Sequence, residues 1–183
     1  MTASWLLGFK MNNKDELLRR FFRYVAVTSQ SDASVEAVPS TKGQTELANL
    51  LANDLEELGL TDISVDEHSI VYGTLEGNTE GPVVGFVSHL DTVDVSLNPD
   101  IHPQVIHYEG GDVLLNKERE IYIRVSEHPE LQNYVGQDII FSDGTSVLGA
   151  DNKSAMANIM TALTVLQNEK NIKNANLKVA VAP

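Results

Sequence analysis

Apolar residues recur at helical spacing in two stretches of the first third of the chain. Over residues 14–27, bulky apolar side chains lie three or four positions apart and share one helix face. Over residues 41–58, a stripe of leucines begins after Thr41, a candidate N-cap with Gln44 three positions later, and it stops at Gly59. The pattern therefore predicts two amphipathic helices.

Short apolar and β-branched runs follow these helices and predict strands. The run over residues 83–88 (VVGFVS) is almost wholly apolar, which is typical of a central strand covered on both faces. We interpret residues from about 94 to about 135 as a loop-rich insertion, and another helix is predicted from about Lys153 to Glu169. The predicted strands cover residues 63–65, 70–75, 83–88, 113–115, 121–125, 137–141 and 177–182.

The order of these elements predicts an α/β fold. Helical and extended segments alternate, so we expect a three-layer sandwich with a mostly parallel sheet flanked by helices. A chain of 183 residues is expected to form one domain. We place that domain at residues 11–183, because residues 1–10 (MTASWLLGFK) lack the features of a secretory signal and are interpreted as a frayed extension or an alternative start.

Composition narrows the classes of function. Thirteen Lys and Arg against 26 Asp and Glu give a formal charge of −13, which opposes binding to nucleic acid phosphates. No apolar run approaches the roughly 20 residues that span a bilayer, so no membrane partner is expected. The chain has no cysteine, which excludes disulfides and thiolate chemistry and fits a reducing compartment such as the cytoplasm.

The first candidate site is the run Ser88-His89-Leu90-Asp91-Thr92 at the carboxyl end of the apolar strand. His89 and Asp91 lie two positions apart, so in an extended segment both project to the same side. One imidazole nitrogen can then bind a metal while the carboxylate accepts a hydrogen bond from the other. The alternative is that His89 packs or caps and that Asp91 begins a turn.

The second candidate site is the run Leu148-Gly149-Ala150-Asp151-Asn152-Lys153-Ser154, which lies between a turn and a helix. The Asp151 carboxylate could bind a cation and bridge two metals, with the Lys153 charge nearby tempering the local field. The alternative is that Asp151 or Asn152 caps the helix N-terminus, where its oxygen satisfies a free backbone N–H. We expect both sites to lie at the same edge of one sheet.

Together, the runs SHLDT and LGADNK resemble the M20 metallopeptidases, and in particular the peptidase T branch of tripeptide aminopeptidases. The resemblance covers nearly all of residues 11–183. Four further stretches agree with it: LLRRFFRYVAVTSQS at 17–31, VPSTKGQ at 38–44, HPQVIHYEGGD at 102–112 and AMANIMTALTVL at 155–166.

The resemblance implies a role for each matching residue. His89 would be a ligand of one zinc ion, Asp151 the carboxylate that bridges two zinc ions, and Asp91 the catalytic-site aspartate that orients the histidine. The peptide bond after Asp151 would be cis. Asn152 departs from the Asp that the branch often has there. The family's general-base glutamate, its other metal ligands and its lid or dimerisation domain have no counterpart in the sequence, so we expect an incomplete, N-terminal part of a di-zinc catalytic domain.

The resemblance therefore implies a zinc-dependent aminopeptidase that releases the N-terminal residue of tripeptides, with two zinc ions per complete site. Its partners would be small peptide substrates and, for the full-length protein, a second copy in a homodimer. This chain alone is expected to be inactive. The alternatives are another M20 amide hydrolase, a deacylase or a carboxypeptidase, and a non-catalytic truncated product that acts as a binding module.

Overall fold

Helices and strands alternate along the chain in a computed structural model that describes residues 12–183. The three predicted helices are confirmed, with ends within three residues of those expected. The described helices are α1 (Asn13–Val25), α2 (Lys42–Glu57), α3 (Ala150–Asn168) and the short 3-10 helix η1 (Pro129–Tyr134). The described strands are β1 (Thr61–Val65), β2 (Val71–Leu75), β3 (Val84–His89), β4 (Pro103–Tyr108), β5 (Val113–Asn116), β6 (Ile121–Ile123), β7 (Gln137–Ser142) and β8 (Leu177–Ala182).

The main sheet has four strands in the order β1-β2-β8-β3 among the described residues. The α/β class is confirmed, but the sheet is mixed rather than mostly parallel. Only β3 and β8 run parallel, while β2 is antiparallel to both β1 and β8. The cause is the connections: the short turn over residues 66–70 joins β1 to β2 as an antiparallel pair, whereas a long crossover that includes α3 brings β8 alongside β3.

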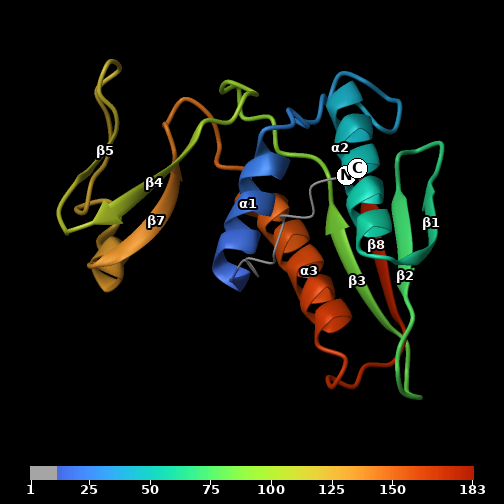
Figure 1. Ribbon diagram of the computed structural model, residues 1–183. Coiled ribbons are helices and arrows are strands. Elements are labelled where there is room, and N and C mark those ends of the chain that lie inside the picture. The colour runs from blue at the N-terminus through green and yellow to red at the C-terminus, as the bar shows by residue number, and fades with distance from the viewer. Residues whose placement is uncertain (1–11) are drawn as a thin grey trace, which may run out of the picture.

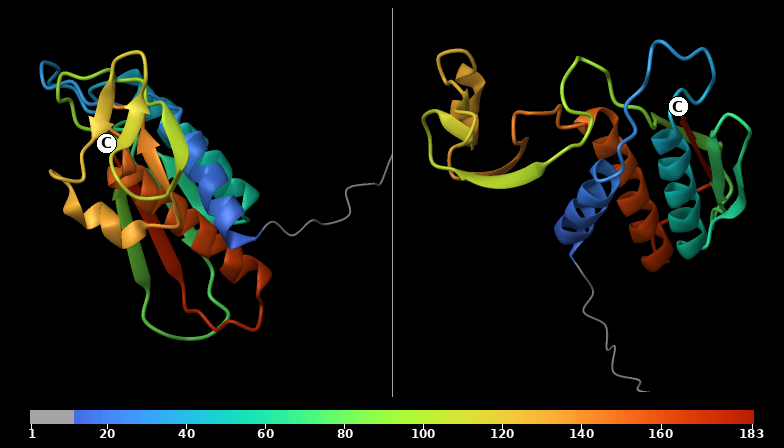
Figure 2. Two further views of the ribbon diagram at one scale, coloured as in Figure 1. Left: turned by 90° about the vertical axis from the view of Figure 1, so that its left-hand side faces the viewer. Right: turned by 90° about the horizontal axis from the view of Figure 1, so that it is seen from above.

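The helices α1, α2 and α3 lie on one face of this sheet (Figures 1 and 2). The described residues therefore form two layers, where the sequence predicted three. None of the helices within residues 12–183 combines the length and hydropathy that crossing a bilayer requires. The core between the layers is built from α1, α2, α3 and the inner side of β2 and β8, and its largest fully buried apolar members are Tyr24, Leu47, Leu51, Leu55, Leu90, Met156, Met160 and Leu163.

Strand β3 lies at an edge of the sheet, which differs from the central position that its apolar sequence predicted. Val84 and Phe86 share the helix-covered side with Leu177 and Val179 of β8, but they are 46% and 37% exposed. Val87, on the opposite side, is 77% exposed. Within the described residues, one long side of β3 has no partner strand, so its backbone groups and apolar side chains face solvent.

This exposed edge predicts self-association that a charge should suppress. We expect Val87→Lys to raise the solubility of the chain and to change its stability by less than about 0.5 kcal/mol, because a lysine at an exposed site needs no repacking. Static light scattering against protein concentration measures the effect. Val135→Lys, at a 53% exposed position outside any strand, is the matched control. Equal gains from both variants would show that net charge, and not the edge, is responsible.

Residues 103–142 form a lobe beyond α1 and α3, on the side away from the main sheet (Figures 1 and 2). β4 pairs with β7, and β5 with β6, in two small antiparallel ribbons. The lobe has its own apolar cluster of Tyr108, Val113, Leu131 and Phe141. Two differences from the expected layout follow: β4 lies in the stretch interpreted as loop-rich, and β7 pairs within the lobe rather than in the main sheet.

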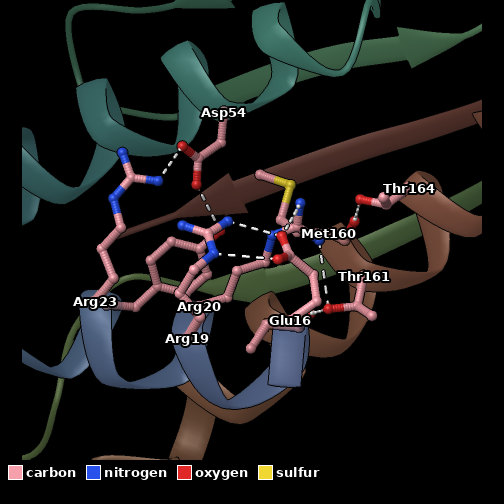
Figure 3. Close-up of polar contacts among 10 residues, drawn as sticks. Glu16, Arg19, Arg20, Arg23, Asp54, Met160, Thr161 and Thr164 are labelled. Atoms are coloured by element: carbon pink, nitrogen blue, oxygen red, sulfur yellow. Dashed lines mark hydrogen bonds and ion pairs between the residues drawn. The ribbon is translucent and has the colours of Figure 1, made fainter. Parts of the chain in front are cut away.

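A buried arginine of α1 contacts α3. Arg20 is 5% exposed, and its guanidinium contacts the Glu16 carboxylate at 2.9 Å and donates to Thr161 Oγ1 at 3.4 Å (Figure 3). The Arg20 Nε is buried and has no hydrogen-bond partner within residues 12–183. Arg20 thus joins α1 to α3, the helix at whose beginning Asp151 lies.

A second buried contact joins α1 to α2. Asp54 of α2 is 4% exposed and accepts hydrogen bonds from the Arg23 guanidinium and, at 2.7 Å, from the Tyr24 hydroxyl (Figure 3 shows Arg23 and Asp54). Burial, reinforced by the Asp54 carboxylate, raises the pKa of Tyr24 above its ordinary range. Asp54 therefore acts as the polar link between two helices that otherwise meet through apolar side chains.

Candidate active site

His89 is the last residue of β3, and its imidazole meets the carboxylate two residues later. The Nδ1 atom lies 2.9 Å from Asp91 Oδ1 and 3.1 Å from the Asp91 carbonyl oxygen. The predicted two-residue spacing thus brings these side chains into contact. A carboxylate at Nδ1 fixes the orientation of the ring, with Nε2 facing away from Asp91. It also favours the tautomer that carries its proton on Nδ1, which leaves the Nε2 lone pair free.

Asp151 lies at the beginning of α3, and its Oδ1 atom is 3.0 Å from His89 Nε2. The structure therefore brings the two predicted metal-site residues together, although 62 positions separate them in the sequence. The helix-capping alternative for Asp151 is not what the structure has. The N-cap position of α3 is Gly149, without a side-chain cap, and the Asp151 carboxylate faces the histidine.

The backbone at the start of α3 is irregular, and this aims the Asp151 side chain. Asp151 and Asn152 have non-helical dihedral angles, so regular helix begins at Lys153, as predicted. The Asp151–Asn152 peptide bond is cis, as the resemblance implied. Gly149 has a φ of 69°, a left-handed conformation that favours glycine at the turn into the helix.

The topology of the sheet explains why these residues meet. β3 and β8 are parallel, and the chain enters α3 at the end of the molecule where β3 finishes (Figure 1). The lobe is inserted between the two motifs: the chain leaves Asp91, passes through the lobe and returns to Asp151. The candidate site therefore lies at the carboxyl edge of the sheet, where α/β proteins bind ligands.

The electrostatics of the site centre on His89. Partial burial of the imidazole lowers its pKa, but the carboxylates of Asp151 and Asp91 outweigh burial and raise the pKa of His89 above its ordinary value. The Asp151 side chain is 93% exposed and the His89 side chain 40% exposed, so solvent reaches the atoms between them. Only a doubly protonated imidazolium can donate to both carboxylates, and a cation on Nε2 would take the place of one of these protons.

The donor set fits part of a metal site. An imidazole nitrogen and a carboxylate oxygen are both common zinc ligands, and here they face each other across an exposed gap. Within residues 12–183, no group of three or more His, Asp or Glu side chains is arranged to hold a metal ion. The described residues thus supply two donors and an orienting carboxylate, and any further ligand must come from elsewhere.

Lys153, whose charge was expected to temper the field near Asp151, donates its hydrogen bond to the end of α1. Its side chain is fully buried, and its Nζ atom donates to the Val27 carbonyl oxygen at 2.7 Å. Burial lowers the pKa of the Lys153 ammonium to about 8. Sequence reasoning missed this contact because nothing in the pattern links a helix N-terminus to the end of α1.

The other four histidines contact groups other than Asp91 and Asp151. His102, His107 and His128 each pair with a carboxylate in or beside the lobe. His68 lies close to the Val38 carbonyl and to Glu67. Each of these four side chains is more than half exposed.

No protein-family model matches the chain, but comparison with individual proteins gives clear relatives. The chain is 55% identical over 150 residues to a peptidase T-like protein of Yersinia pestis, and this match covers 81% of the chain and 37% of the relative. It is 42% identical to peptidase T of Geobacillus kaustophilus, over 93% of the chain and 42% of the relative. The chain thus spans about two fifths of the length of the curated relatives it matches.

The solved structures agree with these relatives. The crystal structure of aminopeptidase PepT from Bacillus cereus matches 92% of the chain with a TM-score of 0.60 and 25% sequence identity, and the match covers 36% of that protein. Comparison by fold and comparison by sequence therefore both lead to peptidase T proteins, and the resemblance carried by the two motifs is confirmed. Over the two fifths of their length that it spans, the chain is therefore homologous to peptidase T proteins in both sequence and fold.

Proposed function

We propose that the chain is the part of a zinc-dependent tripeptide aminopeptidase that carries His89, Asp91 and Asp151 of the metal centre. The names of its relatives support a peptidase, and the observation that carries the proposal is the meeting of His89 Nε2 with the Asp151 carboxylate at 3.0 Å. Because the chain spans only part of its relatives, the activity belongs to the whole protein. Its substrates would be tripeptides, its compartment the cytoplasm and its assembly a homodimer.

In this proposal each residue has a separate task. His89 would hold a zinc ion through Nε2, and Asp151 would hold it through a carboxylate oxygen that can also reach a second zinc. Asp91 accepts a hydrogen bond from Nδ1, which keeps the ring in place and increases the basicity of Nε2. Bound zinc would lower the pKa of a water molecule and polarise the scissile carbonyl group.

The same metal donors are compatible with the hydrolysis of a different class of amide. Another amide hydrolase, such as a deacylase or a carboxypeptidase, would use the same metal chemistry and differ in the residues that recognise the substrate. Hydrolysis of tripeptides with a free N-terminus, but not of N-acylated amino acids, by the whole protein supports the aminopeptidase. The reverse preference supports the alternative.

We further propose that this chain alone binds zinc weakly and has no peptidase activity. Two protein donors leave a tetrahedral zinc shell incomplete, and residues 12–183 offer no third in place. The measurement is tripeptide hydrolysis by the purified chain in the presence of zinc. Turnover that a chelator abolishes would contradict the proposal.

Substitution of the histidine separates the proposed site from nonspecific zinc binding. We expect His89→Ala to abolish the zinc binding that titration calorimetry detects for the chain, because it removes one of the two donors that residues 12–183 supply. His107→Ala is the matched control: His107 also has a carboxylate, Asp138, at 2.8 Å from its Nδ1, but lies in the lobe. Loss of binding in the control alone, or unchanged binding in His89→Ala, would place the zinc elsewhere.

A further inference from the structure

Residues 27–31 form a short irregular segment, which contacts both halves of the candidate site. On one side it is bonded to the chain that follows His89. The Ser29 hydroxyl donates to the Leu90 carbonyl oxygen at 2.7 Å, and the Thr92 N–H donates to the Ser29 carbonyl oxygen at 3.2 Å. Ser29, Leu90 and Thr92 are each at most 2% exposed, so these bonds are shielded from water.

On its other side the 27–31 segment is bonded to the helix that carries Asp151. Lys153, two residues after Asp151, donates from Nζ to the Val27 carbonyl oxygen at 2.7 Å. The Lys153 side chain is completely buried, and no carboxylate within residues 12–183 forms an ion pair with it. Its positive charge lies just after the C-terminal end of α1, where the helix dipole favours a cation.

Burial of a lysine at this position is energetically unfavourable by itself. An apolar side chain of similar length would fill the space without removing a charge from water, so the lysine is explained only by what its charged hydrogen bond holds. That bond joins the segment which supports Leu90 and Thr92 to the first turn of α3. The His89 and Asp151 side chains lie at the two ends of this connection.

We propose that Lys153 is a positioning residue which, through the 27–31 segment, fixes the separation of His89 from Asp151. Lys153 contacts the Val27 carbonyl rather than either of these side chains, so it acts through the backbone that carries them. That this separation serves to bind zinc rests on the proposed function. The role of Lys153 in fixing the separation does not depend on it.

The test is the nitrogen resonances of the His89 imidazole in Lys153→Met, recorded without metal. Methionine keeps the length and volume of the buried stem but cannot donate to Val27. We expect the Nε2 resonance to move toward that of a free imidazole, because contact with Asp151 is lost, while the amide resonances of β2 and β8 stay in place. A His89 spectrum identical to that of the wild type would overturn the proposal.

Two further variants separate positioning by Lys153 from a general loss of stability. Thr161→Val removes a buried hydroxyl from the same helix, one that contacts Arg20 rather than the 27–31 segment. It is expected to lower stability without moving the His89 resonances, and an equal displacement in this variant would overturn the proposal. If Lys153→Met does not fold, Ser29→Ala, which breaks the bond to Leu90, is expected to give the same displacement, and its absence there overturns the proposal.

Zinc alone is the probe for the link to the proposed function. We expect Lys153→Met to raise the zinc dissociation constant about tenfold, as loss of a residue that orients ligands does elsewhere. If the His89 resonances move but His89→Ala binds zinc as tightly as the wild-type chain, positioning by Lys153 stands and the proposed zinc site fails. If zinc binds equally well to both and the resonances do not move, the proposed function stands and the positioning role is overturned.

Discussion

Replacement of Gly43 by alanine is expected to destabilise the chain by about 3 kcal/mol or more, as insertion of a group into filled space does. A Cβ atom at Gly43 would lie 1.6 Å from the Thr28 carbonyl oxygen, which is closer than any non-bonded contact allows. Backbone must move to relieve this clash, because no flexible side chain is involved. The first turn of α2 would have to separate from residues 27–31.

The comparison variant is Gly85→Ala in β3. A Cβ at Gly85 meets no atom within 4 Å, so the change in stability is expected to stay within about 0.5 kcal/mol. Urea denaturation followed by circular dichroism gives both free energies of unfolding. A Gly43→Ala variant as stable as Gly85→Ala would show that α2 and residues 27–31 are not packed as described.

Replacement of Asp54 by asparagine is expected to lower the free energy of unfolding by about 2–4 kcal/mol. The substitution keeps the shape of the side chain but removes the charge that the Arg23 guanidinium meets. The amide also offers only one oxygen to the two donors, Arg23 and the Tyr24 hydroxyl, and turns N–H groups toward one of them. Because Arg23 is 35% exposed, water offsets part of the loss.

Asp112→Asn is the matched control for this prediction. Asp112 also pairs with an arginine, Arg124, at 2.8 Å, but the two side chains are 40% and 48% exposed. Exposed pairs of this kind contribute little to stability, so the urea midpoint is expected to change little. A larger loss in Asp112→Asn than in Asp54→Asn would contradict the role given to burial.

The spacing of apolar residues predicted the helices, because a helix depends mainly on residues three or four positions apart. The apolar face of α1 and the leucine stripe of α2 set both helices, because each repeats at helical spacing on one side. The start of α2 shows the limit of such signals. Thr41 does occupy the N-cap, but its hydroxyl donates to the Gln30 carbonyl, and the Gln44 side chain reaches back to the Ser40 N–H instead.

The order of the strands could not be predicted in this way. An apolar run such as that of β3 indicates that a strand packs against something, but not what covers each side of it. β7 has the same kind of composition as the strands of the main sheet, yet it pairs with β4 because the two are neighbours across the lobe. Pairing depends on long-range contacts, and these leave no trace in the spacing of apolar residues.

The candidate site was more predictable than the sheet. His89 and Asp91 are close in sequence, so spacing alone predicted their contact. Asp151 was a candidate cation ligand from its own motif, and the resemblance added its role as a bridging carboxylate. The supporting contacts were not predictable, because Ser29 and Lys153 are a small polar residue and a charged one, which are ordinarily found in contact with water. Their burial follows from the position of residues 27–31 between the two halves of the site, which is a property of the fold.

The placement of β8 between β2 and β3 has a consequence for how the protein is made. β8 is farther along the chain than the other described strands, yet β3 has no other partner in the main sheet. On the ribosome, β3 and the inner side of α2 are therefore made before β8 and remain without it through synthesis of the whole lobe and of α3. A nascent chain in this state exposes apolar surface for seconds. A chaperone that covers this surface would prevent aggregation most effectively during this interval.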